Sequence, residues 1–382
     1  MKKHRISALL LTAVLAASAL SGCAATPAAS AAAPASTSAS ASASASASAS
    51  ASASEKDGTQ IFTDSLGREV ELPTDLQRIA PSGTLSQIIL YTIAPDKLVG
   101  WTSNPTDAMK KYFDEKYTDL PTFGTFYGKN ADLNTEALIA AAPQVVIDMG
   151  EVKGKKEDMI ADLDSLQKHI GIPVVFIENY LQKSGDSYAM LGKLLGMESE
   201  AQKLTDYCNK TISEANEAVA KIPEDKRVRL YYGEGDTGLQ TNPRGSFHCE
   251  VLDLVGAVNV ADIPVTSGSG GNQISMEQLL LWAPDVMILG PGSIYDTIGT
   301  DPLFKDLKAV QEKCVYQIPS GPYNWLDRPP AINRIIGIKW LGNLLYPEQF
   351  QYDMVAEAKE FYSLFYHYDL SDEEAKTILE KS

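Results

Sequence analysis

Two stretches of the chain, residues 134–148 and 275–289, share one pattern of polar and apolar positions. Each begins with a polar residue suited to cap a helix, Asn134 or Ser275, and has a glutamate in the following turn, where the helix dipole favours negative charge. An apolar helical face follows and ends at a proline, and the next residues form an apolar run typical of a strand buried on both faces. We interpret both stretches as the helix–strand half of a parallel-sheet unit; two unrelated units with similar capping chemistry are the alternative.

Strand-like runs and helices alternate on both sides of each copy. In the first half of the chain we expect elements at residues 78–80, 84–93, 98–101, 159–166 and 172–177. In the second half we expect them at residues 228–232, 250–255, 257–260, 303–310 and 314–318. This alternation predicts an α/β protein with two doubly wound parallel-sheet lobes, and ligands of such sheets bind outside the carboxyl ends of the strands. Two facing lobes would therefore enclose a cleft.

A helical region separates the two halves and predicts how they are joined. Residues 200–221 read as one helix, which would be about 33 Å long. Further helices are expected at residues 330–345, 349–365 and 372–381. We therefore divide the chain into a signal peptide (1–23), a tether (24–57), an N-terminal lobe (58–185), linking helices (186–222), a C-terminal lobe (223–326) and C-terminal helices packed on the lobes (327–382).

The N-terminus has the features of an export signal. A basic start precedes an apolar run over residues 6–20, which is too short for a comfortable membrane span. It ends in Leu-Ser-Gly-Cys, which resembles the bacterial lipobox and predicts lipidation of Cys23. Residues 24–57 consist mainly of Ala and Ser, cannot form a core, and predict a flexible tether with a reach of roughly 30 Å. We expect an extracytoplasmic protein anchored to the outer face of the cell membrane.

Composition excludes several functions. A formal net charge of −16 argues against a nucleic-acid partner. No nucleophile elbow, P-loop or zinc-protease motif occurs, so we expect no catalytic residues and no cofactor. The cysteines and histidines after residue 23 have no metal-ligand spacing, so we also expect neither a disulfide framework nor a protein-held metal. These residues are Cys208, Cys249, Cys314, His169, His248 and His367.

Three groups of residues carry a resemblance to a known family. They are the opening Thr63-Asp-Ser-Leu-Gly-Arg-Glu-Val70, the doubled Glu…Pro segments described above, and the run from Asp301 to Pro319. Together they resemble the substrate-binding proteins of ABC importers for iron–siderophore, haem and corrinoid complexes. The resemblance covers residues 59 to about 350 and implies two lobes joined by a single rigid helix.

The resemblance implies a ligand class but not one ligand. An iron–siderophore complex is our first choice, a corrinoid or haem the second, and a molybdate-like oxyanion the third. For a chelate, the ligand's own chelator would supply the metal coordination. A tethered cell-surface hydrolase and a structural adhesin are the alternatives from other classes.

Candidate ligand contacts lie just past the predicted strand ends. The segment from Ser82 to Thr84 opens a helix, whose backbone N–H groups could hold an anion, or it could serve only as a cap. Residues 320–328 place aromatics beside an arginine, which suits a planar or catecholate-bearing anionic complex. Alternatively, Tyr323 and Trp325 pack under the final helices and Arg328 pairs with Asp327. The full set of candidates is Ser82, Thr84, Trp101, Phe126, Tyr127, Tyr232, Arg244, Tyr323, Trp325 and Arg328.

The resemblance also implies macromolecular partners. A monomer would deliver its ligand to an ABC permease with its ATPase, and each lobe would offer an acidic residue to arginines of the permease. Glu151 or Glu157 could serve in the first lobe, and Asp296 or Asp301 in the second.

Overall fold

The computed structural model describes residues 58–127, 131–264 and 271–382. The expected signal peptide with Cys23 and the tether over residues 24–57 lie outside the described residues. Among the helices that are described, none combines the length and apolar character needed to cross a membrane.

The first lobe has the expected parallel sheet and, before it, a hairpin. The hairpin pairs β1 (Thr59–Thr63) with β2 (Glu69–Pro73) in antiparallel register. The parallel sheet has the order β3-β4-β5, with β3 at Ile79–Pro81, β4 at Val145–Gly150 and β5 at Val174–Glu178. Its helices are α1 (Thr84–Ile93), α2 (Asp107–Lys110), α3 (Glu115–Thr118), α4 (Thr135–Ala140) and α5 (Lys156–Ile170).

The second lobe has a four-stranded parallel sheet of order β11-β10-β6-β8. Its strands are β6 (Arg229–Gly233), β8 (Val258–Asn259), β10 (Val286–Leu289) and β11 (Val315–Gln317). A small antiparallel pair lies beside it, β7 (Gln240–Thr241) with β9 (Asn272–Gln273). Its helices are α8 (Glu250–Leu254), α9 (Met276–Trp282), α10 (Tyr295–Ile298) and α11 (Lys308–Gln311).

The duplicated pattern has a counterpart in the backbone. The side chains of Asn134 and Ser275 each accept a hydrogen bond from the N–H three residues on, at 3.0 and 3.2 Å. Both helices then end at an alanine in the left-handed region, Ala142 at φ 46° and Ala283 at φ 42°. The following strands, β4 and β10, lie inside their sheets with a parallel neighbour on each side. The two lobes are therefore built around the same helix–strand unit.

Two expected elements are shorter than predicted. Residues 98–101 form only single bridges, Leu98 with Ile79 and Trp101 with Thr122, because the Trp101 N–H bonds to the Pro121 carbonyl instead of extending a ladder. The helix expected over residues 303–310 begins only at Lys308. Before it, the Asp301 carboxylate accepts the Leu303 N–H at 2.9 Å and holds the chain in a turn.

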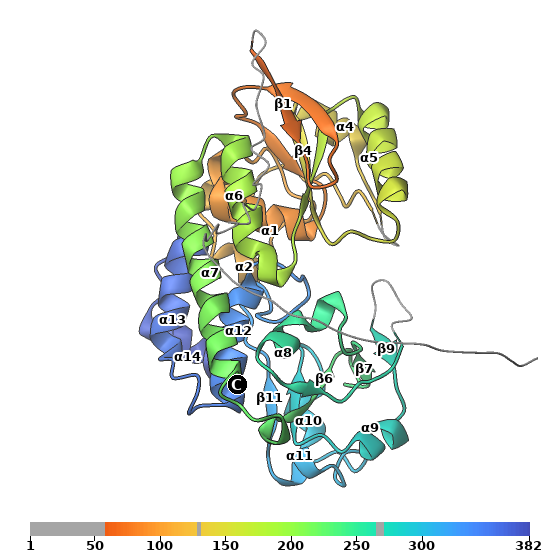
Figure 1. Cartoon of the computed structure of the whole chain (residues 1–382), viewed down its shortest axis with the longest axis vertical. Helices are drawn as coiled ribbons and strands as arrows, with labels where there is room; N and C mark the ends of the chain where they lie inside the picture. Colours follow the sequence, from red (N-terminus) through yellow and green to blue (C-terminus); the bar gives the residue numbers. More distant parts are fainter. Residues whose placement is uncertain (1–57, 128–130, 265–270) are drawn as a thin grey trace, which may run out of the picture. The chain divides into compact units, whose positions relative to one another are not determined.

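Helices between and after the lobes join the two sheets (Figure 1). They are α6 (Ser184–Leu195), the long α7 (Glu198–Val219), α12 (Asn333–Leu345), α13 (Met354–Phe361), a π-turn (Tyr362–Tyr366) and α14 (Asp372–Leu379). One continuous core holds apolar side chains of both lobes together with these helices. Helix α12 packs closely against the backbone at Trp325, and this contact requires Gly337, because a Cβ there would lie 2.0 Å from the Trp325 carbonyl oxygen.

Candidate functional site

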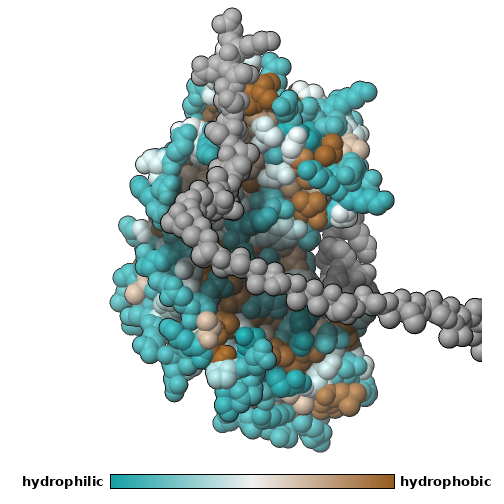
Figure 2. All heavy atoms as spheres, viewed as in Figure 1, coloured by the Kyte–Doolittle hydropathy of each residue, from teal (hydrophilic) through white to brown (hydrophobic). Residues whose placement is uncertain are grey.

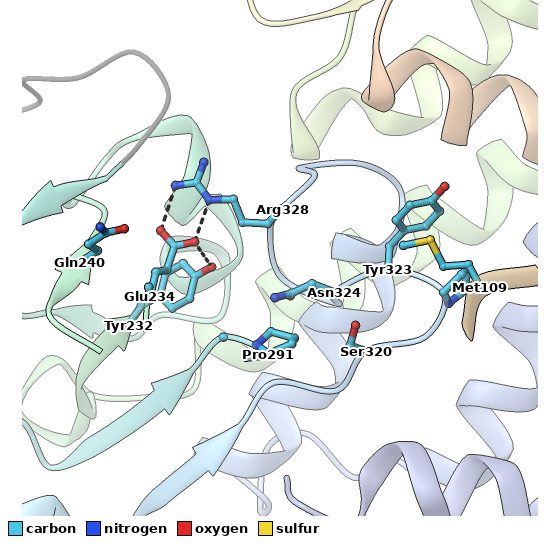
Figure 3. Close-up of a pocket in the computed structure, with 12 residues that line it drawn as sticks. Met109, Tyr232, Glu234, Gln240, Pro291, Ser320, Tyr323, Asn324 and Arg328 are labelled. Atoms are coloured by element: carbon cyan, nitrogen blue, oxygen red, sulfur yellow. Dashed lines mark hydrogen bonds and ion pairs between the residues drawn. The ribbon is translucent and has the colours of Figure 1, made fainter. Parts of the chain in front are cut away.

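A cavity of about 490 Å³ lies at the carboxyl ends of β6, β10 and β11, where ligands of such sheets bind. Most of its lining comes from the second lobe, and Met109 of α2 comes from the first (Figure 3). In the close-up, Met109 and Tyr323 lie together at one end, and Glu234 and Arg328 lie at the other. The lining residues are Met109, Tyr232, Glu234, Gly235, Gln240, Gly290, Pro291, Ser320, Pro322, Tyr323, Asn324 and Arg328.

The segment after β11 supplies one wall because its own hydrogen bonds hold it in an irregular turn. The Asn324 side chain accepts from the Leu326 N–H at 2.7 Å and from the Asp327 N–H at 3.2 Å. Asn333 of α12 donates to the Tyr323 carbonyl at 3.1 Å. As a result Tyr323 and Arg328 face the cavity, whereas Trp325 is fully buried and does not line it.

Arg328 and Glu234 form a two-pronged ion pair in the wall. Arg328 donates from Nε to Glu234 Oε1 at 2.7 Å and from Nη2 to Oε2 at 2.9 Å. Tyr232 and Asn242 also donate to this carboxylate, at 2.8 and 2.6 Å. Burial alone would raise the pKa of Glu234, but the hydrogen bonds and charge of Arg328 outweigh burial and hold that pKa below its usual value. The pair therefore stays ionised at neutral pH.

Beside the cavity a second buried ion pair reaches the first lobe. Arg334 donates to Glu250, whose carboxylate also accepts the Leu181 N–H of the first lobe at 3.1 Å. The guanidinium of Arg334 lies over the Phe247 ring, which in turn meets Tyr180 of the first lobe edge-on at 5.7 Å. These contacts tie the two lobes together next to the pocket.

The first lobe contributes a polar cluster at the ends of β3 and β4. Ser82 donates its hydroxyl hydrogen bond to Asp148, and its Oγ lies 3.1 Å from that of Ser86. Ser86 Oγ accepts the Met149 N–H at 3.2 Å. Burial raises the pKa of Asp148 to about 6, and the hydrogen bond from Ser82 opposes this rise only in part.

The structure brings three of the ten predicted contacts to the cavity: Tyr232, Tyr323 and Arg328. Both predicted tryptophans lie in the core instead, with 0% exposure, because each indole N–H finds an internal acceptor: Trp101 on the Tyr117 carbonyl at 2.7 Å and Trp325 on the Tyr362 hydroxyl at 3.4 Å.

The other five predicted contacts do not line this cavity. Arg244 donates to the Asn259 carbonyl at 2.8 and 3.1 Å and pairs with the exposed Asp262 at 3.8 Å. Ser82 belongs to the Asp148 cluster. Thr84, Phe126 and Tyr127 also lie outside the lining.

The ten predicted contacts do not include Glu234, Asn324 and Asp148, although Asn324 lies in the predicted patch over residues 320–328. A usable signal existed for Asp148, which is an acidic residue inside an otherwise apolar run, and for Glu234, which stands between two glycines after a strand. Within the described part of the chain, no three His, Cys, Asp or Glu side chains are grouped so that they could hold a metal ion.

Comparison with known proteins identifies the family. A family model described as periplasmic binding protein matches residues 79–322, more than half of the chain. The chain belongs to the periplasmic binding protein family. Its members are solute-binding proteins and not enzymes, and the two-lobed α/β architecture agrees with this.

Among solved structures, an ABC transporter solute binding protein from Sulfurospirillum deleyianum is 33% identical, with a TM-score of 0.77 over 84% of this chain and 99% of that one. The molybdate periplasmic binding protein MolA of Haemophilus influenzae has a TM-score of 0.64 at 22% identity, over 81% of this chain and 99% of that one, which shows the fold alone.

Among curated proteins, the Fe(3+)-citrate-binding protein YfmC of Bacillus subtilis is 24% identical over 214 residues, or 55% of this chain. The match spans 64% of that relative's length.

The raised pKa of Asp148 makes stability depend on pH. An unfolded aspartate titrates near pH 3.9, so between about pH 4 and 6 the folded state holds a proton that the unfolded state releases. Stability contributed by this group is therefore lost as pH rises through that window. We expect Asp148→Asn, which keeps an acceptor for Ser82, to be more stable than the wild type by about 1–3 kcal/mol at pH 7 and no more stable at pH 4.

Urea unfolding at both pH values checks this prediction. Asp306→Asn is the matched control, because Asp306 is exposed and the substitution should change stability little at either pH. An advantage of Asp148→Asn that is equal at pH 4 and pH 7 would show that the carboxyl does not titrate in this window.

Proposed function

We propose that this protein captures a metal chelate outside the cytoplasm and delivers it to an ABC permease with its ATPase. The observation that carries the proposal is the cavity of about 490 Å³ at the strand ends, within the size range of small-molecule pockets. An oxyanion as small as molybdate would leave most of this volume to water. Two relatives, a ferric-citrate-binding protein and an ABC transporter solute binding protein, support the same proposal.

Ferric–siderophore complexes remain our first choice of ligand, with corrinoids or haem second and a molybdate-like oxyanion third. Polar groups that could orient such a ligand line the cavity: the hydroxyls of Ser320 and Tyr323 and the amides of Gln240 and Asn324. The phenol of Tyr323 stays protonated because burial raises its pKa to about 12. We further propose that the protein acts as a monomer held to the membrane by lipidated Cys23.

Docking on the permease would use one acidic residue from each lobe. Of the four residues predicted for this role, Asp296 pairs with Lys381 at 2.7 Å and Asp301 caps its own turn. In the first lobe, Glu157 is exposed and Glu151 is only partly so. The duplicated unit offers a better matched pair, because Glu136 of α4 and Glu277 of α9 are both exposed in equivalent first turns. Exposed apolar side chains accompany them: Ile139 beside Glu136, and Leu280 and Leu281 beside Glu277, where apolar surface lies over α9 in Figure 2.

The ligand proposal is tested by titrating the purified protein with a ferric catecholate, a ferric hydroxamate, haemin, cobalamin and molybdate. Trp325 is buried and follows the lining residue Asn324, so a coloured or iron-bearing ligand in the cavity should quench tryptophan fluorescence. We expect a ferric complex to bind most tightly, with a micromolar or lower Kd, or about −8 kcal/mol. Binding of molybdate alone would overturn the chelate proposal, and binding of none of the five would contradict it as well.

The anchor is tested by Cys23→Ala. We expect this variant to lose its lipid, because the thiol that would carry it is absent, and to be released into the medium if other routes process it. Metabolic labelling with a fatty-acid analogue measures the modification, with Cys314→Ala as a control that should keep the label. Label retained on Cys23→Ala would show that the lipid is attached elsewhere.

Docking is tested by reversing both charges, Glu136→Lys with Glu277→Lys. We expect uptake of the labelled chelate by cells to fall at least about tenfold, since each site would lose a charge pair and gain a repulsion. Chelate affinity of the purified variant should not change. Glu157→Lys with Asp301→Lys is the comparison pair: loss of uptake in this pair alone would assign docking to those residues instead.

A further inference from the structure

Of the cavity-lining residues that the structure describes, only two carry a formal charge, and they neutralise each other. Among the described lining residues these are Glu234 and Arg328, joined by parallel hydrogen bonds of 2.7 and 2.9 Å. Figure 3 shows the guanidinium turned onto the carboxylate. An arginine in this position would ordinarily suggest a site for an anion, but here its charge already has a partner.

Glu234 cannot easily leave this arrangement. Its carboxylate is held by the Tyr232 hydroxyl and the Asn242 amide in addition to Arg328, and the residue is only 8% exposed. Its backbone is fixed as well, because the Glu234 N–H and C=O both bond to Gln240 of β7, at 2.7 and 3.2 Å. Releasing Arg328 to an incoming anion would leave a buried, uncompensated carboxylate, which is costly.

A second carboxylate makes the wall still less positive. Asp327 is fully buried, and its Oδ2 lies 3.3 Å from Arg328 Nε. Its other close partner is His248 Nδ1, at 2.8 Å. One arginine and two carboxylates sum to −1 with a neutral His248 and to zero with a protonated one. The chain as a whole carries −16, so its long-range field also opposes anions.

What the pocket offers a ligand is therefore a set of uncharged hydrogen-bonding groups. Gln240, Ser320, Tyr323 and Asn324 supply hydroxyls and amides, whereas the Tyr232 hydroxyl is already bound to Glu234. Arg328 adds one more donor, Nη1–H, which has no hydrogen-bond partner among the described residues. Because Glu234 neutralises the guanidinium, this donor offers direction without a net positive charge.

We infer that the cargo is a metal chelate without net negative charge, such as a ferric tris-hydroxamate, and that Glu234 excludes anionic chelates by neutralising Arg328. This inference rests on the proposed function. It differs from the sequence-based expectation of a catecholate-bearing anion, because the compensation of Arg328 by Glu234 was not visible in the sequence.

The test compares wild type with Glu234→Gln, a substitution that keeps the shape and most hydrogen bonds and leaves Arg328 without its nearest counter-charge. The probes are ferrichrome, an uncharged ferric tris-hydroxamate, a ferric tris-catecholate with several negative charges, and ferric citrate. For the wild type we expect ferrichrome to bind at least about tenfold more tightly than either anionic complex. In Glu234→Gln that ratio should shrink by about tenfold or reverse, and affinity for the anions should fall with added salt.

Asp236→Asn is the matched control, since it removes one negative charge two residues away at an exposed position where water screens it. Its selectivity should equal that of the wild type. Circular dichroism and urea unfolding check that Glu234→Gln folds. If it does not, the wild-type preference for ferrichrome still tests whether the cargo lacks net negative charge.

Each outcome bears on one of the two proposals. A wild-type protein that binds the catecholate or citrate complex as tightly as ferrichrome overturns the charge inference and leaves the proposed function standing. A folded Glu234→Gln with unchanged selectivity overturns the role of Glu234. Failure of all three ferric complexes to bind the wild type contradicts the proposed function itself, and the inference with it.

Discussion

The hydrophobic core shared by the two lobes is the constraint on which the site depends. Tyr188 of α6 and Tyr207 of α7 pack against Phe365, at ring distances of 6.0 and 5.4 Å. Phe113 of the first lobe meets Tyr366 at 6.1 Å. Because burying such rings removes large apolar areas from water, separating the lobes widely would expose much of this core. The C-terminal helices are thus part of the joint between the lobes.

A stiff joint has a direct consequence for binding. The Glu250 carboxylate is held by Arg334 and accepts the Leu181 N–H of the first lobe. These hydrogen bonds also fix the position of one lobe relative to the other. A ligand that enters a preformed pocket loses less of its interaction energy to ordering the protein. Fixed hydrogen-bonding groups in the cavity wall can then select a ligand. The Glu234–Arg328 pair is such a fixed group, because its two hydrogen bonds orient both side chains before any ligand binds.

Periodicity and capping chemistry were enough to predict the lobes, since these are local properties of the chain. Asn134 and Ser275 cap their helices as their side chains predict, and the apolar runs after each proline form the inner strands. The site depends instead on pairs far apart in sequence. Arg328 and Glu234 are 94 residues apart, and no local pattern indicates that they meet. The two tryptophans show the same limit of prediction from sequence. A residue after a predicted strand is expected near the cleft, but the sequence does not tell whether its ring points toward the cleft or into the core.

The duplication allows the strand ends of the two lobes to be compared position by position. In the first lobe Ile79 pairs with Val145, and in the second Leu230 pairs with Val286, at equivalent places in the repeated unit. Glu234 therefore stands where the first lobe has Gly83, the residue that opens α1.

The repeated strands diverge in the same way. Asp148 of β4 corresponds to Leu289 of β10, so the ionisable group lies on the strand in the first lobe and after the strand in the second. Ligands of such sheets bind at the strand ends, whereas the helix caps and inner strands are shared by the two lobes. Changes of sequence at the strand ends can therefore alter the site while the repeated unit keeps its fold.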